Sequence, residues 1–143
     1  MKTKFFKCSH CGNVVVKFVD SGVVPFCCGE PMQELMPQTS DGAFEKHLPV
    51  VISSESDEMR ATGQSHLEPQ VSCSELKVKV GSVEHPMTPE HHIAFIFLET
   101  EEGGQLVQLT PEAKAEATFC VCKCRPMAVY EYCNIHGLWK TVL

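Results

Sequence analysis

The chain has 143 residues, of which 43% are hydrophobic and 21% are charged, and its formal net charge is -6 at pH 7. This composition suits a globular protein with a buried core. The negative charge argues against a nucleic-acid-binding protein, because phosphate contacts need clustered lysine and arginine.

The first eight residues contain no apolar run long enough for a signal peptide, and no later run is long enough to span a membrane. We therefore expect a cytoplasmic protein without a membrane or nucleic-acid partner. The nine cysteines are an odd number. In the cytoplasm, cysteines bind metal more often than they form disulfides.

Two cysteine clusters lie near the N-terminus. Cys8 and Cys11 form a C-x2-C pair, Cys27 and Cys28 are adjacent, and a predicted strand at 14–19 lies between the clusters. Four cysteines in two clusters across a hairpin are typical of a tetrahedral thiolate site for iron or zinc. Successive side chains of a strand point to opposite faces, so Cys27 and Cys28 must lie on a bend.

Two polar segments interrupt the chain. Residues 31–42 contain two prolines and a polar turn, which predict a linker. Residues 53–70 are rich in serine and glutamate and lack periodicity. We interpret them as an exposed loop or insertion in which His66 is solvated.

The remaining sequence predicts a series of short strands. Residues 76–80 alternate between apolar and charged side chains, as in a half-buried strand, whereas residues 93–98 are apolar on both faces. Residues 113–117 are too few for more than about one helical turn. Further strands are predicted at 105–109, 118–123 and 127–132. Many short strands without a long helical pattern indicate an all-β sandwich.

A cysteine and a histidine stand three residues apart near the C-terminus. Cys133 and His136 are followed directly by Gly137 and, two residues later, by Trp139. Such a pair on a tight turn can direct sulfur and nitrogen at one ion. The glycine permits the sharp turn, and the tryptophan can shield the site from water.

Three histidines upstream extend this donor set. His47 precedes an apolar strand, and His85 and His91 lie in a proline-stiffened loop that also contains His92. The six-residue step from His85 favours His91 over its neighbour. Four neutral imidazoles and one thiolate suit Fe(II), and five ligands leave one coordination position open.

The motifs occur in a specific combination and order. The N-terminal C-x2-C…C-C pattern is followed by E-K-H-x-P-V, V-G-S-V-x-H-P-M, x-H-x-I and C-N-x-H-G-L-W. In these motifs the chain resembles desulfoferrodoxin, the two-iron form of superoxide reductase. The resemblance implies a desulforedoxin-like Fe(Cys)4 module at 1–36 and an immunoglobulin-like, neelaredoxin-like β-sandwich at 37–143. It also implies a homodimer.

The resemblance further implies two iron centres. The first is an Fe(Cys)4 centre of Cys8, Cys11, Cys27 and Cys28. The second is an Fe(His)4(Cys) centre with four equatorial nitrogens and one axial thiolate, from His47, His85, His91, His136 and Cys133. The sequence makes no prediction for calcium.

Two charged residues precede the first histidine ligand. Lys46 is placed to attract an anion and to order a proton-donating water, and the family suggests that Glu45 occupies the sixth position of the oxidised iron. Both residues also fit the simpler interpretation of solvated surface charges.

The implied activity is the one-electron reduction of superoxide to hydrogen peroxide, a detoxification of oxidative stress. The electron donor would be reduced rubredoxin or a similar small carrier. An alternative is a non-catalytic iron protein for electron transfer or redox sensing, and a third hypothesis is a zinc-ribbon interaction module with an attached sandwich. An open coordination position next to Lys46 favours the enzyme, because pure transfer sites tend to be closed.

Four cysteines lie outside this scheme, namely Cys73, Cys120, Cys122 and Cys124. The last three recur at every second residue and would share one face of a regular strand. We interpret all four as packing thiols in preference to a third metal site.

Overall fold

The computed structural model describes residues 3–38, 44–55, 74–122 and 124–143. The described residues form strands and one short 3-10 turn, η1 (Phe44–Lys46), and contain no other helix. In particular, no helix of the described residues is long and apolar enough to cross a membrane. The all-β prediction is therefore confirmed.

The N-terminal module consists of two small antiparallel sheets. Strands β1 (Lys4–Lys7), β2 (Val14–Lys17) and β5 (Gln33–Leu35) form one sheet in the order β2-β1-β5. Strands β3 (Phe26–Cys27) and β4 (Glu30–Pro31) form a separate hairpin. The strand β5 lies inside the predicted linker, so the interpretation of residues 33–35 as a linker is wrong.

The remaining strands form two sheets that face each other. One sheet has the order β10-β7-β6, and the other has the order β12-β11-β8-β9. The first contains β6 (Pro49–Glu55), β7 (Glu75–Val80) and β10 (Glu116–Cys120). The second contains β8 (Ile93–Thr100), β9 (Gly103–Gln108), β11 (Pro126–Cys133) and β12 (Gly137–Val142). The predicted sandwich is confirmed, although β6 includes the first three residues of the predicted loop, and 56–70 lie outside the described residues.

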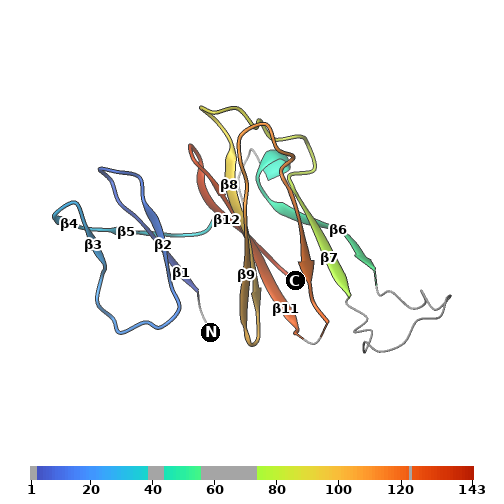
Figure 1. Ribbon diagram of the computed structural model, residues 1–143, viewed down its shortest axis with the longest axis horizontal. Coiled ribbons are helices and arrows are strands. Elements are labelled where there is room, and N and C mark those ends of the chain that lie inside the picture. Colours follow the sequence, from blue (N-terminus) through green and yellow to red (C-terminus); the bar gives the residue numbers. More distant parts are fainter. Residues whose placement is uncertain (1–2, 39–43, 56–73, 123) are drawn as a thin grey trace, which may run out of the picture.

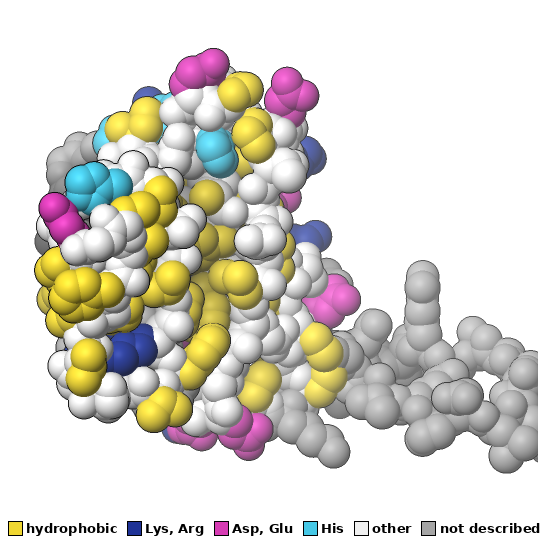
Figure 2. Space-filling model, turned by 60° about the vertical axis from the view of Figure 1, so that its left-hand side comes forward, with side chains coloured by type: hydrophobic (Ala, Val, Ile, Leu, Met, Phe, Trp, Pro, Cys, Tyr) yellow, Lys and Arg dark blue, Asp and Glu magenta, His cyan; other side chains and the backbone are white. Residues whose placement is uncertain are grey.

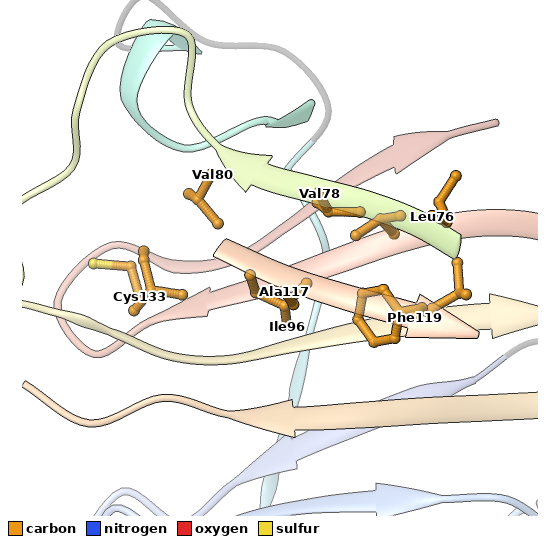
Figure 3. Close-up of a cluster of buried hydrophobic side chains, with 10 residues drawn as sticks. Leu76, Val78, Val80, Ile96, Ala117, Phe119 and Cys133 are labelled. Carbon is orange, nitrogen blue, oxygen red and sulfur yellow. The ribbon is translucent and has the colours of Figure 1, made fainter. Parts of the chain in front are cut away.

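The core between these two sheets follows from the alternation seen in the sequence. Every second residue of β7 is buried, and these side chains meet inward side chains of the facing sheet. The cluster comprises Leu76, Val78, Val80, Ile93, Ile96, Leu98, Ala117, Phe119, Val129 and Cys133. Figure 3 shows Cys133 at one end of this cluster and Phe119 towards the other. One end of the hydrophobic core is therefore formed by the thiol of Cys133.

The N-terminal module packs on the outer face of the four-stranded sheet, so that three sheets stand side by side (Figure 1). Phe5 of β1 is 1% exposed, and its ring centroid lies 5.7 Å from those of Phe95 and Phe97 and 5.3 Å from that of Tyr130. Full burial of such a side chain stabilises a fold by about 1.5–3 kcal/mol. The module is therefore joined to the sandwich by an aromatic cluster.

A buried carboxylate reinforces this junction. Glu99 of β8 accepts hydrogen bonds from the backbone N–H and the hydroxyl of Thr3 at 3.0 and 2.7 Å and from the hydroxyl of Tyr130 at 3.0 Å. Burial alone would raise the pKa of Glu99, but these three donors outweigh it and hold the pKa below its usual range. The charged carboxylate therefore ties the start of the chain to the sandwich.

Candidate metal centres

The first centre lies at the turns that close the two N-terminal hairpins. The four sulfur atoms lie within 4.8 Å of one another. The Sγ atom of Cys27 is 3.6 Å from that of Cys11 and 3.9 Å from that of Cys28. Tetrahedral thiolate ligands bound at about 2.3 Å lie about 3.8 Å apart. The cysteine set therefore fits one tetrahedral ion.

The backbone bends that the adjacent cysteines require are present. Cys28 has a φ of 53°, and Gly29 after it has a φ of 82°. A non-glycine residue in this region is uncommon. It turns the Cys28 sulfur back towards that of Cys27, as expected from the adjacent positions of the two residues.

The closeness of the four thiols favours a bound cation. Backbone N–H groups of Cys11 and His10 lower the pKa of Cys8 to about 6. In contrast, hydrogen bonding with the thiol of Cys11 and then with that of Cys8 raises the pKa of Cys28 to about 12. Without a cation, four sulfurs this close cannot all ionise. A bound metal ion would remove this conflict.

The second centre lies at one end of the sandwich, where four imidazole rings form a closed square. Going round the square, the ring centroids of His47, His85, His91 and His136 are 4.9, 4.7, 4.8 and 4.7 Å apart, with interplanar angles of 71° to 80°. The thiol of Cys133 belongs to the same group, whose five ligand atoms lie within 4.8 Å of one another. The structure thus brings together ligands that span 90 residues of sequence.

Hydrogen bonds and burial prepare two of these imidazoles, His85 and His91, as neutral ligands. His85 Nδ1 lies 2.6 Å from the carbonyl oxygen of Pro86, which fixes the tautomer and leaves Nε2 as the ligand atom. His85 Nε2 and His91 Nε2 are buried and have no hydrogen-bond partner among the described residues. Burial lowers the pKa of His85 to about 4 and also lowers that of His91. Both rings are therefore uncharged at neutral pH.

The distances within the donor set fit a single ion. Imidazole nitrogens bind zinc at about 2.1 Å, so two such nitrogens at a right angle lie about 3.0 Å apart. The distance from His47 Nε2 to His136 Nδ1 is 3.0 Å. The distance from Cys133 Sγ to His136 Nδ1 is 3.6 Å, which corresponds to a wider angle and suits an apical ligand. Burial raises the pKa of Cys133, so a cation is needed to make it a thiolate.

A glycine allows the first ligand to reach the square. Gly81 has a φ of 74°, and a Cβ atom at this position would lie 2.7 Å from the carbonyl oxygens of both Glu45 and Lys46. The Glu45 carbonyl in turn accepts a hydrogen bond from the N–H of Val83 at 2.7 Å. The turn η1 therefore rests directly on the backbone after β7, and this contact places His47.

An asparagine joins the two loops that carry His91 and Cys133. The side chain of Asn134 accepts a hydrogen bond from the N–H of His92 at 2.9 Å and donates one to the carbonyl of Glu90 at 2.8 Å. Glu90 and His92 are the two neighbours of His91, and Asn134 directly follows Cys133. The two hydrogen bonds therefore fix both ligand-bearing loops relative to each other. The ring of His92 lies elsewhere, with Nδ1 at 3.1 Å from the carbonyl of Thr88, and it does not belong to the donor group.

A cavity of about 390 Å³ opens over the square of imidazoles. Its lining contains all four histidine ligands but not Cys133, together with Lys46 and Trp139. The Trp139 ring stacks on His47 with centroids 4.7 Å apart and covers one side of the square. Cys133, fully buried, therefore approaches from the side away from the cavity.

The two charged candidates lie at the surface beside this cavity. Lys46 is exposed and lines the cavity, and its positive charge contributes to the lowered pKa of His91, after burial and the charges of His136 and His92. Glu45 is exposed and is not among the residues that line the cavity. The structure thus places Lys46 nearer to the centre than Glu45.

Other histidines and cysteines of the described residues do not belong to either group. His10 is exposed and its Nε2 is 2.9 Å from a carboxylate oxygen of Glu30. The Sγ atoms of Cys120 and Cys122 are 3.0 Å apart, and neither these residues nor Cys124 belong to a metal group of the described residues. Cys120 is exposed, so the prediction of a packing thiol is wrong there. Cys73 and His66 lie outside the described residues.

Comparisons with known proteins agree with the motifs. A family model described as Desulfoferrodoxin matches residues 39–142. A desulfoferrodoxin of Nitratidesulfovibrio vulgaris is 40% identical over 137 residues, which cover 96% of this chain and 94% of the relative. A superoxide reductase of Pyrococcus horikoshii is 33% identical over 72% of this chain and 90% of its own length.

Solved structures show the same likeness. The superoxide reductase of Treponema pallidum has a TM-score of 0.72 and 32% identity, with 98% of both chains covered. The reduced neelaredoxin of Archaeoglobus fulgidus has a TM-score of 0.50 and 28% identity, and the match covers 75% of this chain and 95% of the other. The family match and the identity of 40% over nearly the whole chain show that this protein belongs to the desulfoferrodoxin family.

Proposed function

We propose that this protein is a superoxide reductase, which converts superoxide to hydrogen peroxide with one electron and two protons at the second centre. The observation that carries the proposal is the arrangement of the donor set. Four imidazoles line an open cavity, and a buried thiol approaches from the other side. A site built only for electron transfer has no need of such a cavity. The relatives named superoxide reductases support this activity.

Iron would bind at both centres in this proposal. Imidazole and thiolate ligands suit Fe(II), so this ion would bind at the second centre. It would supply the electron, and its five ligands would leave one coordination position open. Its ligands would be the group described above, His47, His85, His91, His136 and Cys133. At the first centre, four thiolates would hold an iron that transfers electrons.

Lys46 would bring the substrate to the cavity. The net charge of -6 means that the protein as a whole repels superoxide, so a fast reaction needs a local positive potential. The exposed ammonium group of Lys46 provides such a charge at the cavity lining. It can also order a water molecule that donates a proton to the reduced oxygen.

Glu45 would act after the ion of the second centre has given its electron to superoxide. We assign to its carboxylate the sixth position of the oxidised ion, as the family motif E-K-H suggests. The backbone carbonyl of Glu45 is held by Val83, whereas the side chain is exposed. The carboxylate can therefore change position without disturbing the core.

Electrons would come from reduced rubredoxin or a similar small carrier in the cytoplasm. Cys11 and Cys28 of the first centre are exposed, so a carrier can approach their sulfurs closely.

The first module also exposes a group of large apolar side chains, and Figure 2 shows hydrophobic side chains across this side of the molecule. The most exposed are Phe18, Val19, Val23, Phe26 and Met36, at 56–84%. Such a surface supports the proposal of a homodimer.

Reconstitution with Fe(II) tests the proposal. With the first centre oxidised, the protein should consume one superoxide per reduced second centre and then stop, because that centre holds one stored electron. Adding a reduced electron carrier should restore continuous consumption. Continuous consumption without any reductant would overturn the proposal, because it would indicate dismutation. Protein loaded with Zn(II), which has no redox chemistry, is the matched control.

A further inference from the structure

His136 is the exposed member of the second group, and hydrogen bonds order the turn on which it lies. His136 is exposed, whereas the other four ligands are buried or half-buried. Packing therefore fixes the turn at 133–137 less firmly than it fixes the other ligands. Hydrogen bonds must supply the remaining order, and one is the 3.4 Å contact from the N–H of His136 to Cys133 Sγ.

Gln38 contacts this turn through both its backbone and its side chain. Its side-chain Nε2 donates a hydrogen bond to the carbonyl oxygen of His136 at 2.9 Å. Its backbone N–H donates to the carbonyl of Leu138 at 2.9 Å, and its carbonyl accepts from the N–H of Lys140 at 3.0 Å. Gln38 thus pairs in parallel with Trp139 as an isolated bridge beside β12.

The side chain of Gln38 also forms part of the cavity wall. It lines the cavity together with Lys46 and the four histidines. A Cβ atom at Gly137 would lie 3.9 Å from Gln38 Nε2, so the amide lies directly over the left-handed turn that follows His136. The amide therefore contacts the ligand turn at its most sharply bent point.

The same segment continues from the first module. Strand β5 ends at Leu35, three residues before Gln38, and it pairs with β1. Leu35 packs against the aromatic cluster of the two modules. The backbone N–H and carbonyl of Gln38 are both hydrogen-bonded, so its side chain can be presented with little further loss of backbone entropy.

We propose that Gln38 is a positioning residue of the second centre, whose side-chain amide holds the His136 turn in the geometry that binds the metal. The inference deepens the proposed function, since it concerns iron binding at that centre. The hydrogen bond acts on the backbone of His136, and its effect reaches the metal through the orientation of the imidazole. Segment 33–38 is then a supporting part of the centre instead of a linker.

Substitution of Gln38 by Met tests this role. Methionine keeps the length of the side chain and removes the N–H donor. A net contribution of a neutral hydrogen bond corresponds to about a two- to tenfold change in an equilibrium. We expect Gln38→Met to speed the release of Fe(II) from the second centre to a chelator by about this factor, with no change at the first centre. The thiolate-to-iron absorption band and the reduction potential of the second centre should shift as well.

Two further variants keep the test decisive. Gln33→Met changes an exposed glutamine of β5 in the same way and should leave both centres as in the wild type. Gln38→Glu keeps the length but places carboxylate oxygen against the His136 carbonyl, so its effect should be at least as large as that of methionine. An unchanged band, potential and release rate in both Gln38 variants would overturn the proposal, and so would a loss of thermal stability without these changes.

These measurements do not depend on turnover. A shift of the second centre in Gln38→Met together with absent superoxide reduction by the iron-loaded wild type would refute the proposed function and retain the role of Gln38. Normal superoxide reduction with an unperturbed second centre in the variant would refute the role of Gln38 alone.

Discussion

The two candidate metal centres of this protein are built in opposite ways. The ligands of the first centre come from two short turns within 21 residues, and two of its four cysteines are exposed. The ligands of the second centre come from loops at one end of a sandwich, from His47 to His136. A local centre of this kind closes around its ion with four equal ligands. A centre assembled by tertiary structure can place a strong ligand on one side and leave the other side open.

Of the changes considered, loss of the buried thiol of Cys133 should have the largest effect on the second centre and none on the first. Cys133→Ser removes the ligand opposite the cavity and should abolish turnover of the second centre, because a serine hydroxyl is not ionised at neutral pH. The first centre should keep its absorption spectrum. Metal analysis and visible spectra of the reconstituted variant check both expectations. Persistence of the thiolate band of the second centre would mean that another cysteine supplies the sulfur.

A pair of adjacent histidines provides the next test. Removal of a residue that only supports a ligand costs about 10–100-fold in metal affinity, so His91→Ala should cost at least this much at the second centre. His92→Ala is the matched control and should change affinity by less than about threefold, because its ring lies outside the donor group. The iron content of the two variants after dialysis against a chelator decides the assignment, and the reverse order would move the ligand to His92.

The open side of the second centre should depend on Lys46. We expect Lys46→Ala to slow the bimolecular reaction of the reduced protein with superoxide by about one to two orders of magnitude and to flatten its dependence on ionic strength. The metal content should stay the same. Pulse-generated superoxide at several salt concentrations measures these rates.

Lys77 provides a control for this prediction. It is an exposed lysine on β7 outside the cavity lining, and Lys77→Ala should keep the wild-type rate. Equal rates and salt slopes in all three proteins would reduce Lys46 to a solvated surface charge.

The first centre should be dispensable for the chemical step. Cys11→Ser should remove the absorption of the first centre and change the rate of superoxide reduction by less than about twofold, because none of its cysteines lines the cavity. The aromatic junction around Phe5 makes this a demanding test, since the modules are packed together. A proportionate loss of both centres would show that they fold as one unit.

The junction itself should lose stability in acid. Hydrogen bonds to a charged group contribute about 1.5–3 kcal/mol, so Glu99→Gln should lower the free energy of unfolding by about this amount at pH 7. The folded-state pKa of Glu99 is depressed, so this stability is present above the unfolded value near 4.5 and is lost as the pH falls through the folded value. The difference between wild type and variant in urea unfolding should therefore shrink in acid. A difference that is constant with pH would show that the carboxylate charge is unimportant.

The sequence predicts the local centre and the core better than the connections between them. The spacing of Cys8, Cys11, Cys27 and Cys28 encodes a bend that the structure contains, and the alternation at 76–80 marks the inward face of β7. Both features depend on neighbours in the chain.

Contacts between distant segments were not predictable in this way. Proline and polar residues at 31–42 are typical of a linker, yet residues 33–35 pair with β1 as strand β5, and Gln38 lies at the turn after His136. The need for glycine at position 81 arises from the carbonyls of Glu45 and Lys46, which approach only in the folded protein. Cys120 is exposed because Ala117 and Phe119 of β10 face the opposite sheet, which leaves Cys120 on the outer face.

The yield of hydrogen peroxide per superoxide tests the central claim most directly. The reduced, iron-loaded protein should form one hydrogen peroxide for each superoxide consumed, because every superoxide receives an electron from the second centre and none is oxidised. Dismutation would give one hydrogen peroxide for every two superoxide molecules together with dioxygen. A ratio of one with no release of dioxygen is the result that we predict, and a ratio of one half with dioxygen release would contradict the account.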